Sequence, residues 1–281
     1  MTGIRLLAID IDGTLLDSGG RIPEAHHGAL ADASAQGIAI ALVTGRSYHF
    51  TRHIADGLSL PLTLMVNNGA VVKQTDGVTL MRRPLPRETA AGVLASTRAF
   101  EESVAVVFDR QDERQIVFER MDWTHPHRRG YYERNKAFIA AVSPLADALT
   151  EDPLEVMFNG GVAPMRVLAA ALRALPSASQ FSVALTEYEQ RDFSLLDVNG
   201  AGCSKGSTLA RWTGACGFTR DQVMAVGDNL NDLDMLEFAG TAVVMGNAAE
   251  SLKARGFHLT GTNDEEGLAT AIRGLAMGFR P

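Results

Sequence analysis

The chain has 281 residues, of which 46% are hydrophobic and 21% are charged, which is enough apolar material for one large domain or two smaller ones. The formal net charge is -7, so the overall field repels nucleic acid and anionic lipid, and we expect neither as a partner. The sequence has no basic leader, and no unbroken apolar stretch reaches the roughly 18 residues of a membrane span, so we predict a cytoplasmic protein. The two cysteines, Cys203 and Cys216, fit neither a disulfide framework nor a zinc site.

Strands alternate with helices at both ends of the chain. The segment 23–37 reads as a helix, with Pro23 early and Gly37 late, as helix ends prefer. Short apolar runs with little polar alternation are typical of strands that are buried on both faces. These runs are 4–10, 38–44, 61–72, 223–229 and 241–246. The alternation predicts an α/β fold with a doubly wound, parallel, Rossmann-like sheet.

The middle of the chain has a different pattern, in which a helix is followed by two adjacent strands, twice. The expected helices are 86–101 and 163–175, and the expected strands are 104–109, 115–120, 154–160, 181–187 and 192–198. The stretch 121–150 is polar, aromatic and poorly patterned. Short turns between adjacent strands favour an antiparallel sheet, so we predict an α+β domain, residues 83–194, inserted into a core made of 1–82 and 195–281.

The first predicted strand ends in two carboxylates, Asp10 and Asp12, within the sequence "DIDGT". Ligands of an open parallel sheet bind where the strands' carboxyl ends emerge, and Asp10 stands at such an end. Residues two apart on an extended backbone point to one side. An Asx turn would account for one aspartate and Gly13, but it does not require the second aspartate.

Polar residues suited to the same chemistry follow other predicted strands or begin helices. They are Thr44, Gly45 and Arg46 in "VTGR", Lys205 in "GCSKGS", and Asp228, Asn231 and Asp232 in "GDNLND". Backbone N–H groups at a helix start can hold a phosphate. Several carboxylates at one sheet edge repel one another, which makes sense mainly around a cation, and all-oxygen ligands favour Mg²⁺.

Together these motifs resemble the four ordered motifs of the haloacid dehalogenase superfamily of phosphatases. The resemblance covers about 1–82 and 195–281, and "NNGA" at 67–70 is similar to the Cof-like subfamily. Only 34 positions separate Asp10 from Thr44, whereas 161 separate Thr44 from Lys205, so a cap domain fits only in the second gap.

The resemblance implies a role for each matched residue. Asp10 would be the nucleophile that forms an aspartyl-phosphate, and Asp12 would protonate the leaving oxygen and later activate water. Mg²⁺ would be held by Asp10, the Asp12 backbone carbonyl and Asp228, with Asp232 and Arg46 in support. The phosphoryl group would be bound by Ile11, Thr44, Gly45, Lys205 and Asn231.

The resemblance implies hydrolysis of a small phosphorylated metabolite, of the sugar phosphate, pyridoxal phosphate or flavin mononucleotide type. A phosphomutase shares the aspartyl-phosphate step and stays open as an alternative. A non-enzymatic phospho-acceptor or regulatory domain is a second alternative, against which the intact Asp10 and Asp12 argue. The sequence does not specify an oligomeric state.

Two other features of the sequence have less weight. His49 and His53 are four residues apart on an expected helix, a spacing that can bind metal, but no third ligand is evident and we interpret them as surface or supporting groups. The stretch 125–136, "HPHRRGYYERNK", is either a substrate-facing loop of the insert or a solvated surface.

Overall fold

The structure is a computed structural model that describes residues 3–110 and 114–278. The chain divides into two compact units. One contains the residues up to Arg82 together with those from Ser204 onward, and the other is Arg83–Cys203. Each unit has its own sheet and its own core.

The first unit is built on an eight-stranded sheet with strand order β14-β13-β12-β1-β2-β3-β4-β5. The pairs from β14 to β3 are parallel, and β4 and β5 extend the sheet as an antiparallel edge. The strands are β1 (Leu6–Ile9), β2 (Ala39–Val43), β3 (Leu62–Val66), β4 (Val71–Gln74), β5 (Thr79–Arg82), β12 (Val223–Gly227), β13 (Thr241–Val244) and β14 (His258–Leu259). This confirms the predicted α/β class with a parallel sheet.

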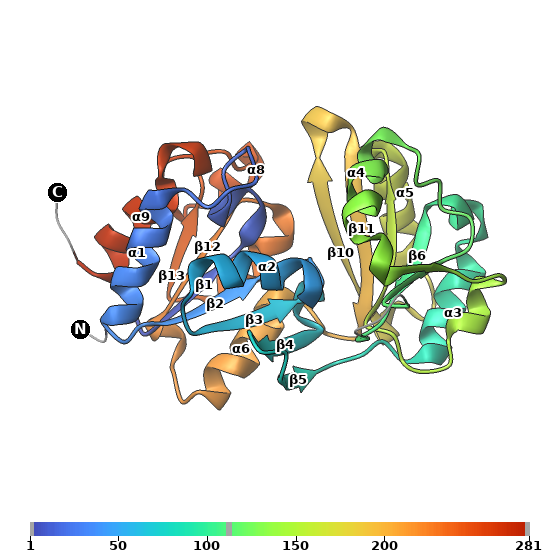
Figure 1. The fold of residues 1–281 in the computed structure, drawn as a ribbon, viewed down its shortest axis with the longest axis horizontal. Helices are drawn as coiled ribbons and strands as arrows, with labels where there is room; N and C mark the ends of the chain where they lie inside the picture. The colour runs from blue at the N-terminus through green and yellow to red at the C-terminus, as the bar shows by residue number, and fades with distance from the viewer. Residues whose placement is uncertain (1–2, 111–113, 279–281) are drawn as a thin grey trace. The chain divides into compact units, whose positions relative to one another are not determined.

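Helices cover both faces of this sheet. They are α1 (Glu24–Ala35), α2 (Tyr48–Leu58), α6 (Lys205–Ala215), α7 (Leu233–Phe238), α8 (Glu250–Lys253) and α9 (Gly267–Ala271). Leu6 and Ala8 of β1 belong to the core that contains Leu209 of α6 and Leu236 of α7. Because side chains alternate along a strand, Leu7 and Ile9 point to the opposite face of the sheet. Helices α1 and α9 pack against each other (Figure 1). The central strands are therefore buried on both faces, which explains their continuous apolar sequences.

The second unit is built on a six-stranded sheet with strand order β10-β11-β9-β6-β7-β8. Its pairs are antiparallel except for β7 with β8, which is parallel. The elements are α3 (Arg87–Ser96), β6 (Val104–Val107), β7 (Ile116–Phe118), α4 (Pro126–Asn135), β8 (Ile139–Ala141), β9 (Glu155–Gly160), α5 (Val162–Arg173), β10 (Phe181–Tyr188) and β11 (Phe193–Gly200). The core of this unit includes Phe108, Phe158, Leu168 and Leu196.

Several local predictions differ from the structure. The boundary placed at 194/195 falls inside β11, which pairs with β9 and β10 as far as Gly200, so the unit ends at Cys203. The run 61–72 is not one strand, because the backbone turns at Asn67–Gly69 between β3 and β4. The poorly patterned stretch 121–150, for which no element was predicted, contains α4 and β8.

Arg128 of α4 has a structural role in the second unit. Its side chain is 9% exposed, and its Nε donates to Asn159 Oδ1 of β9. Its Nη2 donates to the Asn159 carbonyl at 2.9 Å and to Ser103 Oγ at 3.2 Å. The guanidinium therefore satisfies buried acceptors and fixes α4 on the sheet, and these contacts belong to the unit's own packing.

Replacing Arg128 tests this role. We expect Arg128→Ala to lower the free energy of unfolding by about 2–3 kcal/mol, because buried acceptors lose a charged donor. Arg129→Ala is the matched control, since Arg129 is exposed, and its effect should stay within about 0.5 kcal/mol. Urea denaturation of both variants measures the difference, and equal midpoints would contradict the structural role.

Candidate active site

The predicted site residues of the first unit converge on one edge of its sheet. Asp10 follows β1, Thr44 follows β2 and Asp228 follows β12. These strands are parallel neighbours, so their carboxyl ends meet at the same edge. Lys205 is the first residue of α6, which is capped by the Ser204 side chain.

A buried lysine lies between two of the carboxylates. The Nζ of Lys205 donates to Asp10 Oδ1 and to Asp232 Oδ1, each at 2.6 Å. Lys205 is 2% exposed, Asp10 is 5% exposed and Asp232 is fully buried. Buried charges need oppositely charged partners, and here the ammonium of Lys205 pairs with both carboxylates. The lysine thus allows two carboxylates to coexist in the interior.

Burial and mutual repulsion perturb the acids of this cluster. Burial, with the negative charge of Asp232, raises the pKa of Asp10 to about 7, although Lys205 opposes the shift. Burial and the charge of Asp10 also raise the pKa of Asp228, while the Thr14 hydroxyl, which donates to Asp228 Oδ1 at 3.1 Å, opposes this. Burial lowers the pKa of Lys205, but the charges of Asp10 and Asp232 outweigh it and the net direction is upward. The site therefore has a deficit of positive charge.

The acidic cluster suits a hard divalent cation. Asp10, Asp228 and Asp232 each offer an oxygen, and these oxygens lie within 4.8 Å of one another. Asp232 has less capacity left for a metal, because its Oδ2 accepts hydrogen bonds from the backbone N–H groups of Asp228 and Asn229. Asp10 and Asp228 would therefore be the better ligands for a metal, and their carboxylate oxygens fit Mg²⁺.

Asp12 has a different environment from Asp10. Arg46 binds its carboxylate through two hydrogen bonds, Nε to Oδ2 at 2.8 Å and Nη2 to Oδ1 at 2.6 Å. About a third of each side chain is exposed. The Asp12 carboxylate is not part of the acidic cluster, so only its backbone carbonyl remains as the metal ligand that the family resemblance implies. Ile11, which lies between the two aspartates, is buried.

The turn after Asp12 leaves no room for a side chain at Gly13. Its φ is +80°, and a Cβ built there would lie 2.4 Å from Asp228 Oδ2. Asn247 Nδ2 donates to the Gly13 carbonyl at 2.9 Å, and Asn247 Oδ1 accepts from the Asn263 N–H at 3.1 Å. Asn247 was not among the predicted site residues, although it follows β13 and so stands at the same carboxyl edge.

The remaining predicted residues occupy the turns of the same edge. The Arg46 N–H donates to Thr44 Oγ1 at 3.1 Å, and Gly45 lies beside the Asn68 side chain. The Oδ1 of Asn231 is buried, and the described residues offer it no hydrogen-bond partner. Asn231 therefore has a side-chain amide oxygen, Oδ1, that is available to a ligand in the turn that also carries Asp228.

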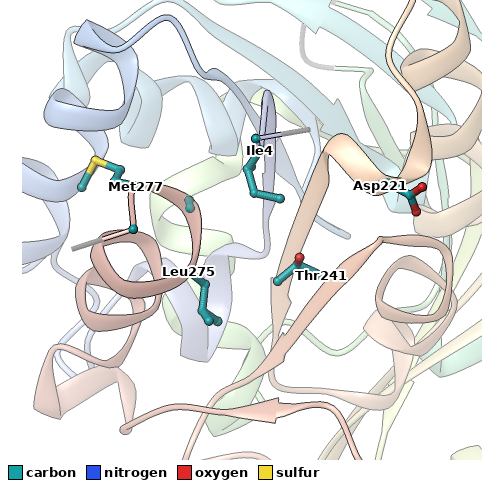
Figure 2. Close-up of a pocket in the computed structure, with 8 residues that line it drawn as sticks. Ile4, Asp221, Thr241, Leu275 and Met277 are labelled. Atoms are coloured by element: carbon teal, nitrogen blue, oxygen red, sulfur yellow. The ribbon is translucent and has the colours of Figure 1, made fainter. Parts of the chain in front are cut away.

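Two other features lie outside this site. His49 and His53 belong to no metal-type cluster among the residues described, and His53 is exposed. A pocket is lined by Ile4, Asp221, Thr241, Leu275 and Met277 among others (Figure 2). Ile4, Asp221 and Thr241 stand at the amino ends of β1, β12 and β13, so this pocket is at the edge opposite the acidic cluster.

Comparison with known proteins identifies the family. A family model described as haloacid dehalogenase-like hydrolase matches residues 7–272, which is most of the chain. The chain belongs to this family. The sequence-based prediction of a haloacid dehalogenase superfamily phosphatase is confirmed.

Relatives of this haloacid dehalogenase-like hydrolase match over nearly their whole length. The 5-amino-6-(5-phospho-D-ribitylamino)uracil phosphatase of Bacillus subtilis (strain 168) is 26% identical over 96% of this chain and 95% of its own. The pyridoxal phosphate phosphatase of Escherichia coli (strain K12) is 26% identical over 95% of this chain and 97% of its own. A haloacid dehalogenase-like hydrolase structure from Bacteroides thetaiotaomicron has a TM-score of 0.77 at 26% identity, covering 96% of this chain and 98% of its own.

None of the helices in the described part of the hydrolase combines the length and the apolar character that crossing a membrane requires.

The contact between Gly13 and Asp228 gives a mutational test. We expect Gly13→Ala to lower kcat/KM about a hundredfold, because the methyl group displaces the Asp228 carboxylate. Gly20→Ala is the control, since Gly20 also has a positive φ, +75°, but nothing within 4 Å of its Cβ position. Both variants bear the backbone cost of about 1 kcal/mol or more, so an equal loss of activity in a phosphate-release assay would refute the contact's role.

His26 gives a test of pH dependence. Its Nδ1–H donates to the Leu15 carbonyl at 3.0 Å, at the end of the turn that follows Asp10. Burial lowers the pKa of His26 below its ordinary value of 6.5. As the pH falls below about 6.5, the unfolded chain takes up a proton at His26 that the native chain does not, so unfolding becomes easier.

We therefore expect wild-type stability to fall relative to that of His26→Asn as the pH decreases from 7.5 to 5.5. The other titrating groups are common to both proteins and cancel in the difference. Urea denaturation along this pH series measures the free energy of unfolding of both proteins. If the value for wild type minus that for His26→Asn stays constant or increases as the pH decreases, the pKa of His26 is not depressed.

Proposed function

We propose that this hydrolase removes the phosphoryl group from a small phosphorylated metabolite, in a Mg²⁺-dependent reaction that proceeds through an aspartyl-phosphate on Asp10. The observation that supports this most is the buried Lys205, which binds Asp10 and Asp232 beside Asp228. A purely structural sheet edge does not need three clustered acids. A phosphoryl-transfer site needs both the anionic nucleophile and the surrounding positive charge.

The reaction has two steps. In the first, an Asp10 carboxylate oxygen attacks phosphorus and the bond from phosphorus to the leaving oxygen breaks. Asp12 gives that oxygen a proton, which requires that Arg46 has first released the Asp12 carboxylate and that Asp12 has taken up a proton from solvent. In the second, Asp12 takes a proton from water, the water oxygen attacks phosphorus, and the bond from phosphorus to the Asp10 oxygen breaks, which frees inorganic phosphate and restores the Asp10 carboxylate. Arg46 binds both carboxylate oxygens of Asp12, and the Asp12 carboxylate is not part of the acidic cluster, which suits separate roles for the two aspartates.

The transferring phosphoryl group would be bound by Thr44, the Gly45 N–H, Lys205 and Asn231, with Ile11 contributing through its backbone. Thr44 and Gly45 follow β2, so their donors stand at the same edge as Asp10. Such donors stabilise the charge on the phosphoryl oxygens and hold them in line for attack.

The metal would be held by Asp10, the Asp12 carbonyl and Asp228, with Asp232 supporting the turn that carries Asp228. When bound, Mg²⁺ would neutralise part of the negative charge on the phosphoryl oxygens. The protein's own contribution is to hold Asp10 and Asp228 close together in spite of their repulsion.

The names of two relatives support the proposed substrate class. Two relatives are named for a ribitylaminouracil phosphate and for pyridoxal phosphate, so we propose a substrate of the sugar phosphate, pyridoxal phosphate or flavin mononucleotide type. Apart from proton transfer by Asp12 to the leaving oxygen, the contacts that we propose for the first unit are to the phosphoryl group or the metal. We therefore assign selection among esters to the other unit, Arg83–Cys203.

The first test is phosphate release from a panel of phosphorylated metabolites with Mg²⁺, using wild type and Asp10→Asn. We expect one or a few substrates to be strongly preferred, and Asp10→Asn to lose activity by at least about a thousandfold because the amide is not nucleophilic. Asp221→Asn, at the opposite edge, is the control and should keep full activity. Turnover by Asp10→Asn near the wild-type rate would exclude the covalent mechanism.

The second test concerns the metal. Excess chelator should abolish hydrolysis, Mg²⁺ should restore it, and Ca²⁺ should restore it poorly, because Ca²⁺ prefers more ligands at longer distances. The same additions of chelator, Mg²⁺ and Ca²⁺ to Gly20→Ala are the control for effects of general destabilisation, and this variant should respond to each as the wild type does. Undiminished hydrolysis in chelator would show that the acidic cluster serves another purpose.

A further inference from the structure

The chain makes an unusual turn through Asn67, Asn68 and Gly69, between β3 and β4. Their φ values are +50°, +53° and +90°, so three successive residues adopt left-handed backbone. All three are buried. Asparagine tolerates this region better than most residues, but a buried run of this kind persists only where surrounding contacts fix it.

One set of contacts ties the turn to the loop Thr44–Arg46. The Asn68 N–H donates to the Thr44 carbonyl at 3.0 Å, and the Asn67 N–H donates to the Arg46 carbonyl at 2.9 Å. A Cβ built on Gly45 would lie 3.3 Å from Asn68 Oδ1, so the Asn68 side chain packs against Gly45. Both ends of the loop and its centre are therefore fixed by the turn.

A second set of contacts ties the same turn to α6. Thr208 is fully buried, and its Oγ1 donates to the Gly69 carbonyl at 2.9 Å. A Cβ at Gly69 would lie 2.6 Å from Thr208 Oγ1 and 2.7 Å from the Ser204 carbonyl, so the turn sits directly on the first turn of α6. Lys205 belongs to that same helical turn, three residues before Thr208.

We propose that the turn Asn67–Gly69 is a positioning element that holds Thr44 and Gly45 at a fixed separation from the Lys205 ammonium, and that Thr208 is the positioning residue that completes this link. The inference rests on the proposed function, in which Thr44, Gly45 and Lys205 bind one phosphoryl group. These residues lie 161 positions apart in the chain, so local backbone geometry cannot set their separation. The turn contacts both the loop Thr44–Arg46 and the first turn of α6.

Helix α6 supplies a matched pair of threonines for the test. Thr208 donates to Gly69, whereas Thr213, which is also buried, has an Oγ1 for which the described residues offer no partner. Thr208→Val and Thr213→Val make the same isosteric change on the same helix. Thr208→Ser keeps the hydroxyl and should rescue any effect that depends on the hydrogen bond.

The kinetic readouts are kcat for p-nitrophenyl phosphate and inhibition by orthovanadate, both with Mg²⁺. We expect Thr208→Val to lower kcat about tenfold and to weaken orthovanadate inhibition about tenfold. The reason is that Thr44 and Gly45 are no longer held at a fixed distance from the Lys205 ammonium. Thr208→Ser and Thr213→Val should stay within about twofold of wild type. The proposal is overturned if Thr208→Val keeps both values within that range, or if Thr213→Val loses as much.

Amide hydrogen exchange separates this proposal from the proposed function. Thr208→Val should accelerate exchange in the peptides that contain 44–46 and 67–69, whereas Thr213→Val should not. Accelerated exchange in a protein whose wild type hydrolyses no phosphate ester would support the coupling and reject only the phosphatase function. An active wild type with unchanged exchange in Thr208→Val would reject the coupling and leave the function standing.

Discussion

The buried ammonium of Lys205 is the interaction on which the site depends. Both Asp10 and Asp232 lie in the interior and bind this one ammonium. Burial alone would disfavour the charge of either carboxylate. Asp232 in turn holds the backbone of Asp228 in place. One cation thus positions the proposed nucleophile, Asp10, and the turn that carries Asp228, the proposed metal ligand.

The fold supplies this arrangement through parallel strands. β1, β2 and β12 are adjacent, buried on both faces and parallel, so the residues that follow them meet at one edge. Helix α6 then presents Lys205 to that edge, and the turn Asn67–Gly69 packs between the helix and the loop after β2. The glycines at 13 and 69 stand where neighbouring groups leave no room for a Cβ. Rigid elements therefore position each group, and short turns bring the groups together.

Site residues that follow a strand could be predicted from the sequence, whereas contacts between segments distant in the chain could not. Asp10, Thr44 and Asp228 could be placed because buried apolar runs reveal strands, and parallel strands share an edge. The pairing of Asp12 with Arg46, the contacts of Asn247 and the anchoring of Arg128 could not, because each joins segments that are distant in the chain. The extension of β11 to Gly200 was missed for a similar reason: its last residues are held by cross-strand partners, while the sequence there, "VNGAG", favours a turn.

The central claim is that the acidic cluster is a metal-dependent phosphoryl-transfer site, and Mg²⁺ binding measured by isothermal titration calorimetry tests it most directly. The account predicts one Mg²⁺ per wild-type chain, with affinity reduced about a hundredfold or more in Asp228→Asn and unchanged in Asp221→Asn at the opposite edge of the sheet. Binding to Asp228→Asn as tight as binding to wild type, or no binding to wild type, would contradict the account.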